Sequence, residues 1–105
     1  MNIKEVEWDA HNRRRFAEHR PQRCTLAEVD DILLSRCFRS RFREQERQEH
    51  TDESRYVVFG QACTKKFLKV IATPRPNQRM RPITCIHPGD AALVNYLRWR
   101  QTVKR

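Results

Sequence analysis

The residues best suited to chemistry are cations that gather around one predicted hairpin. Two apolar runs, 66–73 and 81–87, flank the turn-forming segment 74–78, and this pattern predicts two antiparallel strands. The cations of this hairpin are Lys66, Lys69, Arg75, Arg79 and Arg81. A rigid strand pair with this much positive charge is expected to bind a polyanion, because arginine forks and lysine ammonium groups both hold phosphate.

Proton transfer could be carried out by five titratable residues. Histidine changes its protonation state near neutral pH, and a carboxylate can act as a base when its surroundings adjust its pKa. The candidates are His11, His19, His50, His87 and Glu53. Each has a structural alternative: His19 lies near a predicted helix end, where it could make a purely structural hydrogen bond, and Glu53 could pair with Arg55.

The charge of the chain is unevenly distributed. The 105 residues form one predicted domain, 1–105, with no repeats, a mean hydropathy of −0.90 and a formal net charge of +9. Residues 1–53 carry a net charge of −1, whereas residues 54–105 carry +10. Solubility alone does not require such segregation, so nucleic acid is the first partner to consider.

The four cysteines show no metal-binding spacing. Cys24, Cys37, Cys63 and Cys85 form no C-x-x-C pair, and each lies in or beside an apolar segment. We therefore expect reduced, buried thiols in a cytoplasmic protein, with no metal and no cofactor. No apolar run approaches 18 residues, so no membrane contact is expected.

An α+β fold must position these residues. We expect a strand at 3–8, a helix at 10–19 capped by Asp9, and a helix from Leu26 to about 35–37 that begins with the capping box Thr25–Glu28. The further expected strands are 55–61, 66–73 and 81–86, and the last helix is capped by Asp90. Together they predict a small antiparallel sheet with two N-terminal helices and one C-terminal helix.

Some parts of the sequence fit more than one structure or role. Residues 38–53 fit either a strand followed by a loop or a helix extension held by Glu–Arg pairs. Pro82 cannot donate to a strand ladder, so it belongs at a strand start or on an edge. On the last helix, Tyr96 and Trp99 suit core packing, but Tyr96 could donate to phosphate, and Trp99 could stack on a base or fill a partner's groove.

The ordered motifs resemble BrnT toxins over nearly the whole chain. They are Val6-Glu7-Trp8-Asp9, His19, Glu28-Val29, Glu53-x-Arg55-Tyr56-Val57-Val58-Phe59-Gly60, Leu68-Lys69-Val70-Ile71, Arg81-Pro82-Ile83-Thr84 and Tyr96. The resemblance implies a RelE-like fold and a metal-independent ribonuclease toxin of a type II toxin–antitoxin pair. It also implies RNA as the target, a BrnA-like ribbon-helix-helix antitoxin as the partner, and promoter DNA bound only by the toxin–antitoxin complex.

Candidate roles follow from this resemblance and from what RNA cleavage requires. A base must take the 2′-hydroxyl proton, an acid must protonate the leaving oxygen, and cations must stabilise the phosphorane. The catalytic candidates are Arg81, Arg55, His19, Glu53 and His87, and the RNA-binding candidates are Arg79, Lys66, Arg75 and Lys69. Arg81 ranks first among the cations because it begins the strand that carries a matched motif.

The sequence departs from the family pattern at two positions. Cys85-Ile86 stands where the family has Ala-Arg, and Ala92 stands where the last helix has Glu. A second hypothesis is therefore a module that binds RNA, DNA or an antitoxin but has lost the chemistry. A third is an interaction protein that forms a homodimer through the 26–37 and 90–103 helices.

Overall fold

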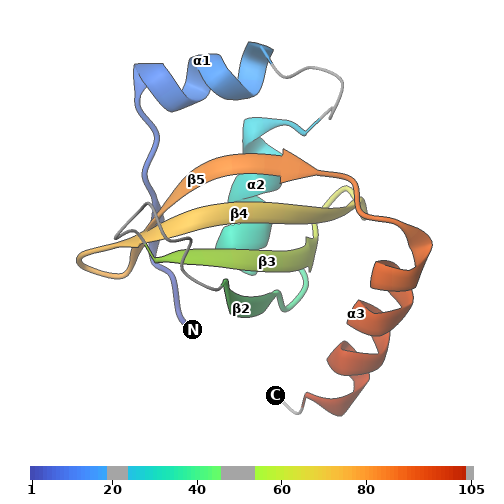
Figure 1. Ribbon diagram of the computed structural model, residues 1–105. Helices are drawn as coiled ribbons and strands as arrows, with labels where there is room; N and C mark the ends of the chain where they lie inside the picture. The colour runs from blue at the N-terminus through green and yellow to red at the C-terminus, as the bar shows by residue number, and fades with distance from the viewer. Residues whose placement is uncertain (19–23, 46–53, 104–105) are drawn as a thin grey trace.

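The computed structural model describes residues 1–18, 24–45 and 54–103 (Figure 1). Its elements are β1 (Glu5–Val6), α1 (Ala10–Glu18), α2 (Leu26–Leu33), β2 (Arg41–Gln45), β3 (Arg55–Gln61), β4 (Phe67–Arg75), β5 (Arg79–Ile86) and α3 (Asp90–Thr102). The α+β prediction is confirmed, and strand 55–61 has the predicted bounds. Among the described residues 38–45, the strand alternative is correct for 41–45; residues 46–53 lie outside the described residues.

The five strands form one sheet in the order β1-β5-β4-β3-β2. The pairs β2–β3, β3–β4 and β4–β5 are all antiparallel. In contrast, β1 pairs parallel with β5, with Glu5 opposite Arg79 and Val6 opposite Met80. The prediction of a purely antiparallel sheet is therefore wrong, and the sheet is mixed. The predicted strand 3–8 is also shorter in the structure, because only two of its residues find a partner on the ladder.

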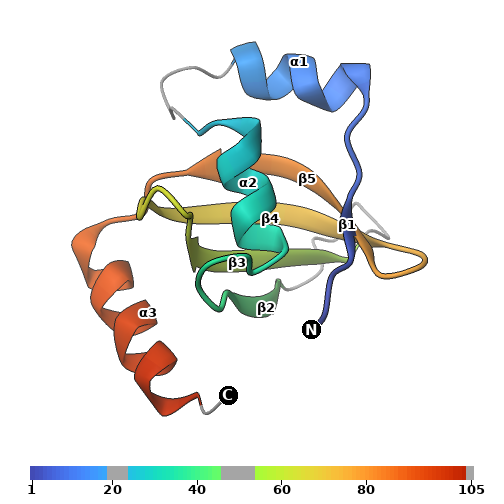
Figure 2. The same cartoon turned by 180° about the vertical axis from the view of Figure 1, so that it is seen from behind.

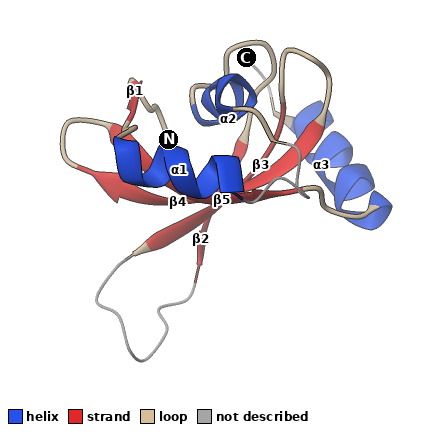
Figure 3. Ribbon diagram, turned by 90° about the horizontal axis from the view of Figure 1, so that it is seen from above, coloured by secondary structure: helices blue, strands red, loops and turns tan. Residues whose placement is uncertain are grey.

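Helix α2 covers one face of the sheet and closes the core. Figures 1 and 2 show α2 lying across β3, β4 and β5, and Figure 3 shows α1 and α2 on the same side. The fully buried side chains of this layer include Val29 and Ile32 from the helix and Val58, Leu68 and Val70 from the strands. Burying these apolar side chains is the main favourable contribution to folding.

Both predicted N-caps of the N-terminal helices are present. The Thr25 hydroxyl accepts from the Glu28 amide, and the Glu28 carboxylate accepts from the Thr25 amide, which completes the capping box. Asp9 Oδ1 accepts from the Asn12 amide at 2.9 Å and so caps α1. The prediction for the last helix is wrong: Gly89 is the N-cap of α3, and Asp90 is its first residue.

The cysteines form two disulfides, so the prediction of reduced thiols is wrong for this structure. Cys24 is bonded to Cys85, and Cys37 is bonded to Cys63. The paired residues lie 61 and 26 positions apart in the chain, but the fold brings their Cα atoms to 6.3 and 5.3 Å. Sequence spacing could not show this approach, because it depends on how α2 sits on the sheet.

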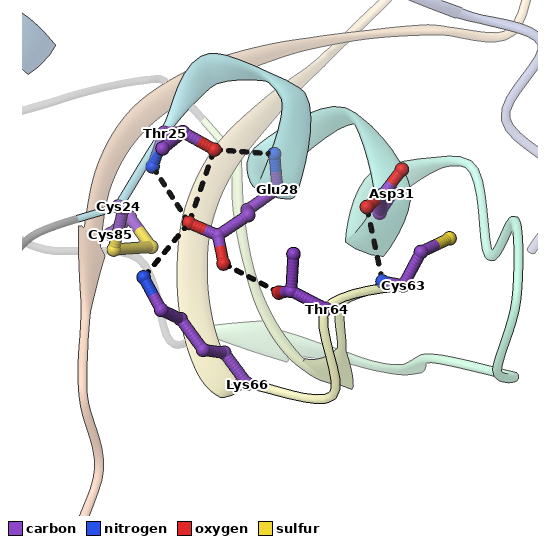
Figure 4. Close-up of polar contacts among 8 residues, drawn as sticks. All are labelled: Cys24, Thr25, Glu28, Asp31, Cys63, Thr64, Lys66 and Cys85. Carbon is purple, nitrogen blue, oxygen red and sulfur yellow. Dashed lines mark hydrogen bonds and ion pairs between the residues drawn. A yellow bond between two sulfur atoms is a disulfide. The ribbon is translucent and has the colours of Figure 1, made fainter.

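Two carboxylates of α2 hold the turn between β3 and β4, beside these disulfides (Figure 4). Glu28 accepts from the Thr64 hydroxyl at 2.7 Å and from Lys66 Nζ at 3.2 Å. Asp31 accepts from the Cys63 amide at 3.0 Å. Burial acts to raise the pKa of Glu28, but the hydrogen bonds from Thr64, Thr25 and Lys66 outweigh it and lower the pKa. Glu28 is therefore a charged anchor inside the fold.

A bulge in β5 changes which residues face the core. The register shifts where Ile71 opposes Thr84 and Ala72 opposes Pro82, which leaves Ile83 as the extra residue. Met80 and Pro82 are buried before the bulge, and Cys85 is buried after it. Pro82 lies beyond the last residue that pairs with β1, where β5 is an edge, so the edge alternative for Pro82 is correct.

Candidate nucleic-acid interface

The face of the sheet opposite α2 carries most of the predicted RNA-binding chemistry. Neither α1 nor α2 lies on this face, and α3 lies beyond the end of the sheet where β5 finishes (Figures 1 and 3). Residues that alternate with the buried core positions project from it. We call this surface the basic face; it is formed by Arg41, Arg43, Arg55, Val57, Phe59, Phe67, Lys69, Ile71, Thr73, Arg75, Arg79, Arg81 and Ile86.

Cross-strand pairs arrange the centre of the basic face in rows. Phe59 opposes both Arg41 on β2 and Lys69 on β4, and Lys69 in turn opposes Ile86 on β5. In the next row, Val57 opposes Arg43 and Ile71. In each row, a cation on the edge strand β2 therefore lies beside an apolar side chain at the centre of the face. Such a surface can hold phosphates at its rim and bases on its apolar part.

A third row brings together two of the catalytic candidates. Thr73 opposes Arg81, and extending the β3–β4 ladder by one residue beyond Tyr56–Ala72 places Arg55 on its other side. Thr73 is only 6% exposed, and its hydroxyl makes no hydrogen bond with any described residue. Two guanidinium groups that flank a hydroxyl have donors suited to a phosphate.

Carboxylates from the N-terminal segment pair with two cations of the hairpin. Arg81 Nη1 lies 2.5 Å from Asp9 Oδ2 and 3.8 Å from Glu7 Oε2, and Arg75 Nε lies 3.1 Å from the same Glu7 oxygen. The hydrogen bond from Arg81, followed by that from the Asn12 amide, lowers the pKa of Asp9 to about 2. Any anion that binds to Arg81 must therefore compete with Asp9.

The remaining described candidates occupy separate places. Lys66 forms an ion pair with Glu28 on the α2 side of the sheet. Arg79 Nε donates to the Pro76 carbonyl at 3.1 Å and so braces the hairpin turn. His87 is exposed just past the end of β5, so the alternation of side chains along the strand does not determine which face it lies on. Lys69 lies on the basic face.

Three titratable candidates have no structural description. His19, His50 and Glu53 lie outside the described residues. The described histidines are His11 in α1 and His87, and neither belongs to the rows of the basic face. No three His, Cys, Asp or Glu side chains in residues 1–18, 24–45 and 54–103 lie together as a metal site would require.

An aromatic series connects the basic face to α3. Phe59 stacks on Phe67 with ring centroids 6.2 Å apart, Phe67 contacts Tyr96 at 5.3 Å, and Tyr96 contacts Trp99 at 5.9 Å. The Tyr96 hydroxyl donates to the Arg39 carbonyl at 2.5 Å. Burial raises the pKa of Tyr96, although Arg100 acts against it. Tyr96 is thus a core residue that fixes α3 to the loop before β2.

Three polar residues of the basic face, Arg41, Arg43 and Thr73, were not among the predicted candidates. Arg41 and Arg43 lie in the stretch for which strand and helix alternatives were both open. Their alternation with Phe42, which packs against the core, was the available signal for a strand. Thr73 could have been found by the same rule, because it shares its strand face with Lys69 and Ile71.

Comparisons with known proteins leave the chain without an assigned family. No family model matches the sequence, no curated protein matches it, and no solved structure matches the fold. None of the described helices is long and apolar enough to cross a membrane.

Proposed function

We propose that the protein binds single-stranded RNA across the basic face. The observation that carries this proposal is the set of rows in which Arg41, Arg43 and Lys69 border Phe59 and Val57. Cations along such a surface would neutralise backbone phosphates, and aromatic or apolar side chains would support unstacked bases. Antiparallel strands hold these groups at fixed spacing, so little ordering entropy is lost when RNA binds.

We further propose that this binding serves RNA cleavage, as in the BrnT toxins that the sequence resembles. In this proposal Arg55 and Arg81 stabilise the charge that develops on the phosphate, and His87, His19 and Glu53 are the candidates for proton transfer. A BrnA-like ribbon-helix-helix antitoxin would neutralise the toxin, and the complex of the two would bind promoter DNA. The ordered motifs and the Arg55–Thr73–Arg81 row support this part of the proposal.

A second candidate function is RNA binding without cleavage, and two positions favour it. Ile86, where the family pattern has Arg, lies opposite Lys69 on the basic face. Ala92, where the pattern has Glu, lines a small hollow with Arg41, Phe59 and Tyr96. A cation and a carboxylate are thus replaced by apolar groups at the surface where substrate would bind.

RNA binding is tested with a Lys69→Ala variant and a Lys4→Ala control. Both changes remove one positive charge, but Lys4 is exposed beside β1 and lies outside the basic face. We expect Lys69→Ala to weaken binding of a labelled RNA oligomer severalfold in fluorescence anisotropy, because one phosphate loses its cation. Equal binding by the two variants, or no binding by the unaltered protein, would refute the proposed interface.

Cleavage is tested with Arg81→Ala and Asp9→Asn. Both variants break the Arg81–Asp9 ion pair, but only the first removes the cation. If Arg81 is catalytic, Arg81→Ala should abolish both growth arrest on expression and the cleavage of RNA by purified protein. Asp9→Asn should retain both effects. If the unaltered protein binds RNA but releases no fragments either with or without a metal chelator, the second candidate function is correct.

A further inference from the structure

A groove between α3 and the segment that precedes β2 plays no part in the function proposed above. Two hollows, of about 740 and 380 Å³, share the wall formed by Cys37, Phe38 and Arg39. Phe42 and Trp99 also line the larger hollow, and Arg100 also lines the smaller. The larger volume lies within the range of small-molecule binding sites, so it can hold a nucleotide. We call these two hollows together the Trp99 groove.

The lining of the Trp99 groove combines flat rings with guanidinium groups. The arginines of the lining are Arg39 and Arg100, and the Arg100 guanidinium lies 4.9 Å from the centroid of Phe38. Arg41 lines neither hollow, but its guanidinium lies 5.7 Å from the centroid of the Trp99 ring. None of the described residues that line either hollow is acidic. Its occupant should therefore carry a planar ring and a negative charge, and a nucleotide has both.

Arg41 connects this groove to the basic face. It opposes Phe59 in the first row of that face, and it lines a third hollow, of about 80 Å³, together with Arg43 and Tyr96. Its guanidinium also lies over Trp99. Because β2 is the outermost strand of the sheet, a single strand of RNA could pass from the basic face around this edge and into the groove.

The walls of the groove are held in place before any ligand binds. The Cys37–Cys63 disulfide ties one wall to the turn after β3. The Ser40 hydroxyl donates to the Ile32 carbonyl at 2.6 Å, and the Tyr96 hydroxyl holds the Arg39 carbonyl. A site fixed in this way loses little conformational entropy on binding.

We propose that the Trp99 groove binds one nucleotide of an RNA strand, with its base against Trp99 and its phosphate at Arg39. This inference rests on the proposed RNA binding and adds a base-stacking subsite to it. The side chain of Arg39 is exposed, and the described contact of this residue with α3 is made by its carbonyl, so the guanidinium can serve a phosphate.

The test measures binding of a uridine octamer by fluorescence anisotropy. We expect Trp99→Leu to weaken binding about tenfold, as for the loss of one stacked base, and Trp99→Phe to retain most of the affinity. Arg39→Ala should weaken binding of the octamer severalfold. Matched controls are Val94→Ala and Arg98→Ala, which alter exposed positions of the same helix outside the groove and should bind as the unaltered protein does.

A second oligomer separates base stacking from charge. An abasic ribose-phosphate octamer should bind the Trp99→Leu variant and the unaltered protein equally, because it has no base to stack. Thermal melting by circular dichroism identifies folded variants. If Trp99→Leu does not fold, Trp99→Phe, Arg39→Ala and the abasic octamer decide the matter.

The possible outcomes separate this inference from the proposed function. If the unaltered protein binds the octamer but neither Trp99→Leu nor Arg39→Ala changes the affinity, the groove is not a nucleotide site and the basic face alone binds RNA. An equal loss of affinity for the abasic octamer also overturns the stacking role. If the unaltered protein binds no RNA, the proposed function fails and the inference fails with it.

Discussion

Asp9 both caps helix α1 and forms an ion pair with Arg81. The dependence of stability on pH tests the contribution of the ion pair. The folded pKa of Asp9, about 2, is below the ordinary value of 3.8, so its contribution to stability is present above about pH 4 and is lost as the pH falls toward 2. Asparagine caps helices as well as aspartate does, so Asp9→Asn removes the charge but keeps the cap.

We therefore expect Asp9→Asn to be less stable than the unaltered protein at pH 7 and equally stable near pH 2. Urea unfolding across this pH range measures the difference. A difference that does not change with pH would show that the variant loses something other than the charged pair with Arg81.

Gly60 offers a prediction about packing between α2 and β3. A Cβ atom at this position would lie 2.6 Å from Ser40 Oγ and 2.8 Å from a methyl carbon of Ile32, both much closer than carbon atoms tolerate. We expect Gly60→Ala to lower the free energy of unfolding by about 1–3 kcal/mol. Gly89→Ala is the control for added volume, because nothing lies within 4 Å of its added Cβ, and it should lose only the smaller preference of the α3 N-cap for glycine. Equal urea midpoints for the two variants would contradict this account.

At the residue scale, the sequence indicates which face of the sheet a side chain lies on, but it does not indicate which distant side chain it pairs with. Strand alternation is a local signal, and it is sufficient to place Lys69 on the face opposite Leu68 and Val70. The Arg81–Asp9 pair spans 72 positions and depends on where the N-terminal segment crosses β5. The sequence therefore did not show that a substrate at Arg81 has to compete with Asp9.

At the element scale, two disulfides bind α2 and its flanking loops to the sheet. Cys24–Cys85 joins the start of α2 to the end of β5, and Cys37–Cys63 joins the loop after α2 to the turn after β3. Each cross-link restricts the unfolded chain, and removing either one is expected to cost about 2–4 kcal/mol, with the larger loss for the longer loop.

This prediction is measured by urea unfolding of the Cys24→Ser/Cys85→Ser and Cys37→Ser/Cys63→Ser variants, with and without a reducing agent. The reducing agent should lower the stability of the unaltered protein and of each double variant, because each variant keeps one disulfide. Peptide mapping by mass spectrometry checks the pairing. Free thiols in protein purified under oxidising conditions would contradict the structure.

Element types were predicted more reliably than their connections. The capping box at Thr25 and the β-branched run at 55–61 are local signals, and both elements formed as expected. The parallel pairing of β1 has no local signal, because it joins residues 5–6 to residues 79–80. The bulge at Ile83 also has no local signal, because it is a shift in the register between β4 and β5.

At the scale of the whole molecule, folding redistributes the charge that the sequence separates. The C-terminal half carries a net charge of +10, but Glu7 and Asp9 from the other half lie against Arg75 and Arg81. The hairpin tip is therefore partly neutralised. Among the cations that border the apolar centre of the basic face, Arg41, Arg43 and Lys69 form no ion pair with a described carboxylate. Counting charge along the sequence thus located the excess of cations in the C-terminal half, but it could not show that Glu7 and Asp9 pair with two of the hairpin cations.

The salt dependence of RNA binding tests the role proposed for the cations that border the apolar centre of the basic face. Each phosphate that a cation neutralises releases condensed counterions and adds about −0.7 to the slope of log K against log salt for a single strand. Arg41, Arg43 and Lys69 together contribute about −2 to the slope, in addition to any phosphate held by Arg39. Arg43→Gln should reduce the slope by about 0.7, whereas Lys4→Gln, which removes a charge away from the basic face, should leave it unchanged. A slope near zero, or one that Lys4→Gln and Arg43→Gln reduce equally, would mean that RNA responds to the overall charge of the molecule and has no defined track across β2, β3 and β4.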